Sequence, residues 1–131
     1  MIPSDVFEGV VHFQQEALER KGLGTPGWPE PEKLVLCTRL IKEEVVDELF
    51  VAIGKRDLVG VADGIADSMF VLLQLAFDCG INMRPVWDEV MRANMAKKGG
   101  PRRADGKILK PLGWSPPNVE LILQKQGWRK P

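Results

Sequence analysis

Two short stretches of the sequence carry acidic side chains at positions where a helix core would be expected to carry apolar ones. They are IKEEVVDELF, residues 41–50, and VADGIADSMF, residues 61–70. Their acidic residues are Glu43, Glu44, Asp47, Glu48, Asp63 and Asp67. Carboxylate oxygens bind hard divalent cations such as Mg²⁺, and a carboxylate can also accept a proton from an attacking water. Metal-assisted hydrolysis is therefore the chemistry to test against the spacing of these residues.

Helical geometry places these acids among apolar residues. Each residue of an α-helix advances about 100° around the axis, so Asp47 and Glu48 lie roughly 60° and 40° from Glu44. By the same rule Asp67 lies about 40° from Asp63. Apolar residues share both arcs, namely Cys37, Leu40 and Val51 on the first and Val59, Phe70 and Phe77 on the second. The acids therefore do not segregate onto a separate polar face.

Carboxylates gathered on apolar faces require compensating positive charge. Burying them unpaired would be costly, and their mutual repulsion would add to that cost. Because no Lys or Arg lies within either arc, we favour a bound divalent cation as the compensating charge. Two alternatives stay open. In the first alternative, the acids are solvent-facing residues of an amphipathic helix pair. In the second, they extend to solvent at the helix ends and pair with a basic loop.

The elements that must position these acids are predicted to be helices. Runs without Gly or Pro, bounded by cap and stop residues, predict helices over residues 4–21, 33–53, 57–79 and 85–96, and a short last helix over 118–126. The bounding residues are Ser4 or Asp5, Gly22, Gly54, Asp57, Gly80 and Pro85. The spacer of residues 55–57 makes the second and third helices antiparallel neighbours. No strand alternation or internal repeat is evident, so we expect an all-α fold.

Length and charge narrow the class of protein further. A chain of 131 residues is the usual size of one domain, and we expect a single domain over residues 1–131. Its 18 basic and 18 acidic residues balance, so the overall charge favours neither nucleic acid nor a membrane as partner. The N-terminus lacks the pattern of a signal peptide, and no uncharged run is long enough to span a membrane, so we expect a cytoplasmic protein. Cys37 and Cys79 form no metal-binding motif and are expected in the core.

Several motifs are similar to those of one superfamily. EEVVD at 43–47 and DGIAD at 63–67 resemble the acidic pattern of the all-α nucleoside triphosphate pyrophosphohydrolases, which include MazG-like and phosphoribosyl-ATP pyrophosphohydrolase-like proteins. EVMRANMAKKGG at 89–100 resembles a subgroup segment ending in NMxK, and ADGKILKP at 104–111 resembles its DGKxxK loop. The resemblance implies a four-helix core with a short C-terminal helix, assembled as a homodimer or a dimer of dimers.

The resemblance also implies roles for the acids. The implied Mg²⁺ ligands, with Mn²⁺ as a substitute, are Glu44, Asp47, Asp63 and Asp67. Glu43 would be a further ligand, or it would contact the metal ligands without binding the metal itself. The alternative is that Glu43 is an ordinary charged residue on the helix surface. Glu48 would orient or deprotonate the attacking water.

Two positions depart from the usual pattern of the superfamily. Asp47 stands where most relatives have Glu, and Gly64 stands where the MazG pattern has the Glu of its second helix. The shorter side chain of Asp47 can still bind a metal through water or after a small shift. Asp63 can supply the missing carboxylate, as in the subgroup with a DxxxD pattern. These substitutions bear on the number and geometry of the ligands.

Four residues beyond the acids are expected to bind substrate. Asn94 and Lys97 are three positions apart and so share a helix face, which suits an amide contacting sugar or base and an ammonium contacting phosphate. Lys107 and Lys110 lie in a basic, Gly- and Pro-rich segment, residues 97–117, that could close over a triphosphate. The alternatives are an ordinary C-terminal helix turn and a mobile basic loop. Trp114 and the other tryptophans are better explained by packing than by base recognition.

The expected reaction is hydrolysis of a nucleoside triphosphate to the monophosphate and pyrophosphate, with a metal-activated water as the nucleophile. The closest alternative is the phosphoribosyl-ATP pyrophosphohydrolase reaction of histidine synthesis, which uses the same architecture and the same bond cleavage. A noncatalytic helical module that binds nucleotide or metal is the alternative from another class. The sequence does not distinguish between bases or between ribose and deoxyribose.

Overall fold

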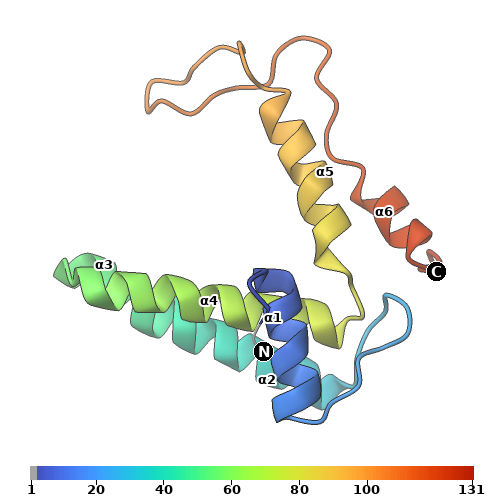
Figure 1. Cartoon of the computed structure of the whole chain (residues 1–131). Helices are drawn as coiled ribbons and strands as arrows, with labels where there is room; N and C mark the ends of the chain where they lie inside the picture. Colours follow the sequence, from blue (N-terminus) through green and yellow to red (C-terminus); the bar gives the residue numbers. More distant parts are fainter. Residues whose placement is uncertain (1–2) are drawn as a thin grey trace. The chain divides into compact units, whose positions relative to one another are not determined.

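The computed structural model describes residues 3–131, which form helices joined by loops (Figure 1). Within these residues the extended pairing is confined to one isolated antiparallel bridge between Arg102 and Ile108, so the all-α class is confirmed. The chain divides into two compact units, Met1–Ile81 and Asn82–Pro131. The expectation of one domain over residues 1–131 stays a prediction.

Two long antiparallel segments form the centre of the first unit (Figure 1). In the first of them α2 (Pro31–Ile41), η2 (Lys42–Leu49) and α3 (Phe50–Lys55) follow one another without interruption. The second is α4 (Leu58–Asp78), which packs against all three. The antiparallel pair expected from the short spacer is therefore confirmed.

The turn between α3 and α4 differs in one detail from the sequence prediction. The helix continues through Gly54, and Arg56 ends it in the left-handed conformation with φ 57°. The Arg56 guanidinium donates a hydrogen bond of 2.7 Å to the carbonyl oxygen of Ile53, which helps to hold this unusual backbone. The prediction of Gly54 as the cap was wrong. Asp57 caps α4 as predicted, because its side chain accepts a hydrogen bond of 3.0 Å from the Gly60 N–H.

The middle of the first long segment is not an α-helix. Over η2 the backbone forms a π-helix, in which hydrogen bonds join residues five apart rather than four. A turn of this kind holds more than four residues, so each residue advances by roughly 90° or less instead of about 100°. The angular positions expected for an α-helix therefore do not apply to residues 42–49.

A shorter helix lies across the pair (Figure 1). It consists of α1 (Val6–His12) and a π-helical continuation, η1 (Phe13–Ala17), and it packs against α4. Asp5 caps α1 as predicted and accepts a hydrogen bond of 2.8 Å from the Phe7 N–H. The helix ends before the predicted residue 21, because Glu19 takes a left-handed conformation with φ 53°.

A buried polar network ties η1 and the residues after it to α2 and α4 at one end of the unit. Gln14 is fully buried. Its side-chain N–H donates a hydrogen bond of 3.3 Å to the side-chain oxygen of Gln74, and its side-chain oxygen accepts one of 2.5 Å from the Arg20 guanidinium. Arg20 also forms an ion pair with buried Asp78, which accepts a hydrogen bond of 3.1 Å from the thiol of Cys37. Each of these buried polar groups thus has a partner, as stability requires. The core position predicted for Cys37 is confirmed.

The close approach of α4 to η2 depends on Gly64. A β-carbon at this position would lie 3.1 Å from the Cδ1 atom and 3.3 Å from the Cα atom of Leu49. A larger residue would therefore push the two helices apart. The glycine that departs from the MazG pattern thus has a packing role beside the acidic residues.

The second unit consists of α5 (Met83–Met95), α6 (Val119–Lys125) and the segment between them. The two ends of the unit are joined by a pair of hydrogen bonds of 2.9 Å between Gln126 and the backbone of Asn82. Glu89 on α5 accepts hydrogen bonds from Arg92 and from the Asn118 N–H, both 2.6 Å long, and these bonds lower its pKa. The two C-terminal helices predicted from the sequence are confirmed.

The segment predicted as a loop, residues 97–117, contains a tight hairpin. The backbone N–H of Arg103 donates a hydrogen bond of 2.8 Å to the Lys107 carbonyl oxygen. The backbone N–H of Leu109 donates one of 2.7 Å to the Pro101 carbonyl oxygen. Gly106 has φ 90°, which allows the turn between them. The DGK motif therefore lies at the tip of an ordered hairpin.

α4 is long and strongly apolar. The helix has 21 residues, and the mean hydropathy of its most apolar 18-residue window is 1.6. By length and composition alone, such a helix could cross a membrane. Only 22% of that window is buried within the described structure. Core helices of soluble proteins share this length and apolar composition, although they are mostly buried, and α4 packs along η2, α2 and α1. These properties are thus weak evidence for a membrane span, and they show that α4 exposes apolar surface.

Candidate metal centre

Three acids from two helices meet in the first unit. Glu44 and Glu48 lie on η2, and Asp67 lies on α4. One carboxylate oxygen from each lies within 4.8 Å of the others. Glu44 and Asp67 are partly buried and Glu48 is exposed, so the group is open to solvent on one side. This arrangement can hold one cation between the helices, and we refer to these three residues as the acidic cluster.

The π-helical turn explains why Glu44 and Glu48 are neighbours. In a turn of more than four residues, a side chain four positions later lies almost directly above the first. A side chain three positions later is rotated by roughly 90°. Glu48 therefore joins Glu44 in the acidic cluster, whereas Asp47 turns away from it. π-Helical turns are often found at functional sites, which agrees with this location.

Asp47 has a partner of its own outside the acidic cluster. The ammonium group of Lys42 lies 3.0 and 3.1 Å from its two carboxylate oxygens, and both side chains are exposed. Residues five apart would be about 140° apart on an α-helix, but they lie close together on a π-helix. The expectation that no cation accompanies the acids was therefore wrong for Asp47. Its predicted role as a metal ligand stays a prediction, and it requires Lys42 to be displaced.

Glu43 and Asp63 are exposed and lie outside the acidic cluster. Glu43 precedes Glu44, and its negative charge helps to raise the pKa of the Glu44 carboxyl. Asp63 lies one helical turn before Asp67 on α4. Their predicted roles, ligand for Asp63 and catalytic group or further ligand for Glu43, stay predictions.

The acidic cluster retains a proton near neutral pH. The pKa of Glu44 rises from its ordinary value of 4.5 to about 7. The main cause is a side-chain hydrogen bond with Glu48, followed by burial and by the negative charges of Glu48, Asp67 and Glu43. A divalent cation would reverse this effect, because it favours the ionised carboxylates and displaces the proton.

A buried oxygen atom of the acidic cluster supports the fit of a metal. Within residues 3–131 the Oε2 atom of Glu44 and the Oγ atom of Ser68 are buried without a hydrogen-bond partner. Such atoms are uncommon in folded proteins and call for an explanation. The acidic cluster offers only carboxylate oxygens, which is the donor type that Mg²⁺ and Mn²⁺ prefer. The residues present therefore fit a hard divalent cation.

Sequence reasoning missed Ser68 and Lys42. Ser68 lies four positions after Gly64 and so shares the side of α4 that packs on η2. No pattern in the sequence distinguishes this serine from others. Lys42 could have been noticed from its position five residues before Asp47, but only if a π-helix had been expected.

The residues predicted to bind substrate lie in the second unit. Asn94 and Lys97 share one face as predicted, and the Lys97 ammonium donates 3.3 Å to the Asn94 side-chain oxygen. The Lys107 backbone N–H donates 3.2 Å to the Asp105 carboxylate, and its side chain is exposed. The Lys110 ammonium lies 5.0 Å from the centre of the Trp114 ring. Contact of these four residues with a substrate stays a prediction.

A helical fold in which carboxylates of two packed helices converge is consistent with the class of all-α pyrophosphohydrolases. The family model described as phosphoribosyl-ATP pyrophosphohydrolase matches residues 12–94, which is more than half of the chain. The chain belongs to the phosphoribosyl-ATP pyrophosphohydrolase family, and its resemblance to the all-α superfamily is thereby confirmed. It is a pyrophosphohydrolase that acts on an acid anhydride. A search of curated proteins finds no match.

Proposed function

We propose that this chain hydrolyses phosphoribosyl-ATP to phosphoribosyl-AMP and pyrophosphate. The observation that carries the proposal is the family match, which covers η2, α4 and every acid of the acidic cluster. The sequence alone favoured a general nucleoside triphosphate as substrate. The family model supports the narrower substrate instead.

Mg²⁺ is the proposed cofactor, with Mn²⁺ as a substitute, and it would be held by Glu44, Glu48 and Asp67. When bound, a divalent ion supplies Lewis acidity toward phosphate oxygens and lowers the pKa of water. Glu48 is the exposed member of the acidic cluster, and we assign it the acceptance of a proton from the attacking water. Glu44, whose pKa is raised to about 7, would have to be ionised to serve as a ligand. No covalent nucleophile is needed for this reaction.

A nucleoside triphosphate or deoxynucleoside triphosphate is the second candidate substrate. The observation that favours it is the segment after residue 94, which lies beyond the family match. This segment carries Lys97, which contacts Asn94 at the last matched residue, and the DGK hairpin, and both features resemble the nucleotide-pool subgroup. Both candidate substrates are cleaved between the α- and β-phosphates. They differ in the nucleoside part of the molecule, which is attached to the α-phosphate.

A substrate panel distinguishes the two candidates. Pyrophosphate release is measured with Mg²⁺ for phosphoribosyl-ATP, ATP and the other canonical and modified nucleoside triphosphates. The proposal predicts the highest ratio of kcat to KM for phosphoribosyl-ATP. A higher ratio for any nucleoside triphosphate would assign the chain to the nucleotide pool. Release of no pyrophosphate from any of them would favour a noncatalytic module, and a melting temperature that Mg²⁺ and nucleotide still raise would show that the module binds them.

We also propose that the first unit associates with a second copy of itself in the cytoplasm. Large apolar side chains are exposed along α3 and α4, including Phe50 at 58%, Leu58 at 80% and Val59 at 82%. A groove of about 650 Å³ between α1, η1 and α4 is lined mainly by apolar side chains such as Phe13 and Phe70. Exposed apolar surface of this extent is typical of an interface.

Sedimentation in detergent-free buffer tests the association. We expect at least a dimer for the wild type and a shift toward monomer for Leu58→Glu. Leu112→Glu is the matched control, because Leu112 is fully exposed in the second unit. A monomeric wild type, or a wild type that requires detergent to stay in solution, would contradict the proposal.

A further inference from the structure

Two lysines from distant parts of the second unit meet at one indole ring. Lys97 follows the C-terminal end of α5, and Lys110 follows the DGK hairpin. Their ammonium nitrogens lie 5.3 and 5.0 Å from the centre of the Trp114 ring. Both distances are within the range of cation–π attraction. The two nitrogens therefore lie within about 10 Å of each other.

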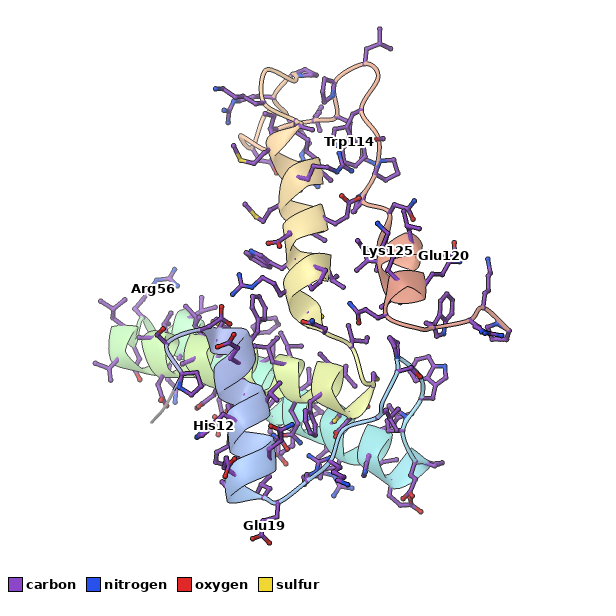
Figure 2. The ribbon with its side chains drawn as sticks, turned by 45° about the vertical axis from the view of Figure 1, so that its right-hand side comes forward. His12, Glu19, Arg56, Trp114, Glu120 and Lys125 are labelled. Carbon is purple, nitrogen blue, oxygen red and sulfur yellow. The ribbon has the colours of Figure 1, made fainter. Side chains whose placement is uncertain are left out.

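Trp114 is itself fixed to the end of α5. Its indole N–H donates a hydrogen bond of 2.6 Å to the carbonyl oxygen of Ala93, which is 1% exposed. The Trp114 N–H donates 3.2 Å to the Pro111 carbonyl, and Gly113 between them has φ 81°. Figure 2 shows Trp114 in the segment that passes beside the C-terminal end of α5. The ring is thus a rigid support for both lysines.

Neither ammonium group is neutralised by a carboxylate. Across the described part of the chain, no ion pair involves Lys97 or Lys110. Lys97 has one further contact, the 3.3 Å hydrogen bond to the Asn94 side-chain oxygen. A lysine ammonium carries three N–H donors, so donors remain free on both residues. Asp105, the one acid between residues 97 and 110, is paired with Arg103.

This geometry has a consequence for anion binding. A free lysine side chain loses considerable rotamer entropy when it is fixed on a ligand. Contact with the Trp114 ring restricts both side chains before any ligand arrives, which lowers that cost. Two nearby cations with free donors also suit a polyphosphate, whose charges are spaced along a chain.

We propose that Trp114 is a positioning residue that holds Lys97 and Lys110 together as one binding pair for the polyphosphate group of the substrate. The proposal rests on the proposed function for the identity of the ligand. The proposal goes beyond that function in two respects. It assigns Trp114 a role other than the packing role that the sequence favoured, and it joins the NMAK and DGKILK motifs into a single surface.

The binding of inorganic tripolyphosphate tests the proposal. The full chain is titrated calorimetrically without divalent metal, so that binding at the acidic cluster does not contribute. Trp114→Leu should raise the dissociation constant about tenfold, because two lysines lose their support. Trp114→Phe should stay within about threefold of wild type, since a phenyl ring still attracts both cations. Trp128→Leu is the matched control in the same unit and should leave the affinity unchanged.

A structural role is separated from a positioning role by two further measurements. In NMR spectra, the side-chain methylene protons next to both ammonium groups should be shifted upfield by the indole ring in the wild type and in Trp128→Leu, but not in Trp114→Leu. In a double-mutant cycle, Trp114→Leu combined with Lys110→Ala should weaken binding less than the product of the two single effects. Independent effects, or equal losses for Trp114→Leu and Trp128→Leu, would overturn the proposal.

The outcome also separates this proposal from the proposed function. If the wild type releases no pyrophosphate from any substrate but binds tripolyphosphate through Trp114, the proposed function fails and the anion-binding pair stands. If turnover occurs and Trp114→Leu binds tripolyphosphate as tightly as the wild type or more tightly, the pair is refuted while the function stands.

Discussion

The carboxyl groups of Glu44 and Glu48 share a hydrogen bond across one π-helical turn, and this bond is the main reason that the pKa of Glu44 rises to about 7. Two negative charges at this distance repel each other, so one proton is retained between them. The arrangement is unfavourable for the protein alone and favourable for binding a cation. Its cost and its use can be measured separately.

The cost is measured by Glu44→Gln without metal. The unfolded state releases this proton near pH 4.5, whereas the folded state keeps it until about pH 7. The contribution of Glu44 to stability is therefore fully present below pH 4.5 and is lost as the pH rises toward and through 7. Gln imitates the protonated form at every pH. We expect an unchanged melting temperature at pH 4.5 and a rise of a few degrees at pH 8.

Glu43→Gln is the matched control, because Glu43 is the exposed neighbour outside the acidic cluster. It should change the melting temperature much less at both pH values. A loss of stability at pH 8 for Glu44→Gln would show that the Glu44 carboxylate stabilises the fold, contrary to this account.

Metal affinity should distinguish Asp67 from Asp47. Asp67→Asn removes a member of the acidic cluster and should weaken Mn²⁺ or Mg²⁺ binding by more than about tenfold. Asp47→Asn should weaken it by less than about threefold, because Asp47 is paired with Lys42 and contributes only a distant charge. Calorimetric titration of each variant measures both. Equal losses would mean that Asp47 leaves Lys42 and binds the metal, as the superfamily resemblance implies.

Lys107→Ala tests the DGK hairpin. The exposed lysine should contact phosphate, and such a charge-assisted bond is worth roughly 1.5 to 3 kcal/mol. Its loss should raise the dissociation constant for a nonhydrolysable triphosphate by about ten- to a hundredfold, with a smaller effect on the monophosphate. Lys110→Ala should act in the same direction. Lys125→Ala, an exposed lysine on α6, should have no effect. Equal losses for both nucleotides would move the contact to sugar or base.

The thiols should be inert in the folded protein. Burial and the hydrogen bond to Asp78 raise the pKa of Cys37 to about 12, and burial also raises the pKa of Cys79. Only the thiolate is nucleophilic, so alkylation at pH 8 should wait for unfolding. Mass spectrometry after iodoacetamide should find no label on the native chain and two labels after denaturation. Rapid labelling of native Cys37 would contradict the buried network with Arg20 and Asp78.

The sequence predicted the positions of the helices well, because their ends depend on local chemistry. Asp5 and Asp57 cap helices through their own side chains, and Gly80 turns the chain after α4 with φ 67°. The π-helical turn could not be predicted in this way. No cap or stop residue marks it, and the packing beside it, such as the close approach of Gly64 to Leu49, joins residues of two different helices.

The same turn decided which acids meet. On an α-helix Glu44 would have both Asp47 and Glu48 nearby, and the sequence could not separate them. The wider turn places Glu48 in the acidic cluster and Asp47 beside Lys42. The family resemblance implied Glu44 and Asp67 as ligands, and the structure brings these two residues together.

The most direct test of the central claim is to identify the products formed from phosphoribosyl-ATP with Mg²⁺, by phosphorus NMR, for the wild type and for Asp67→Asn. The account predicts equal amounts of phosphoribosyl-AMP and pyrophosphate from the wild type and no detectable product from the variant, which should keep its helical circular dichroism. Orthophosphate with a diphosphate product, or undiminished turnover in Asp67→Asn, would contradict the claim that this acidic cluster cleaves the bond between the α- and β-phosphates.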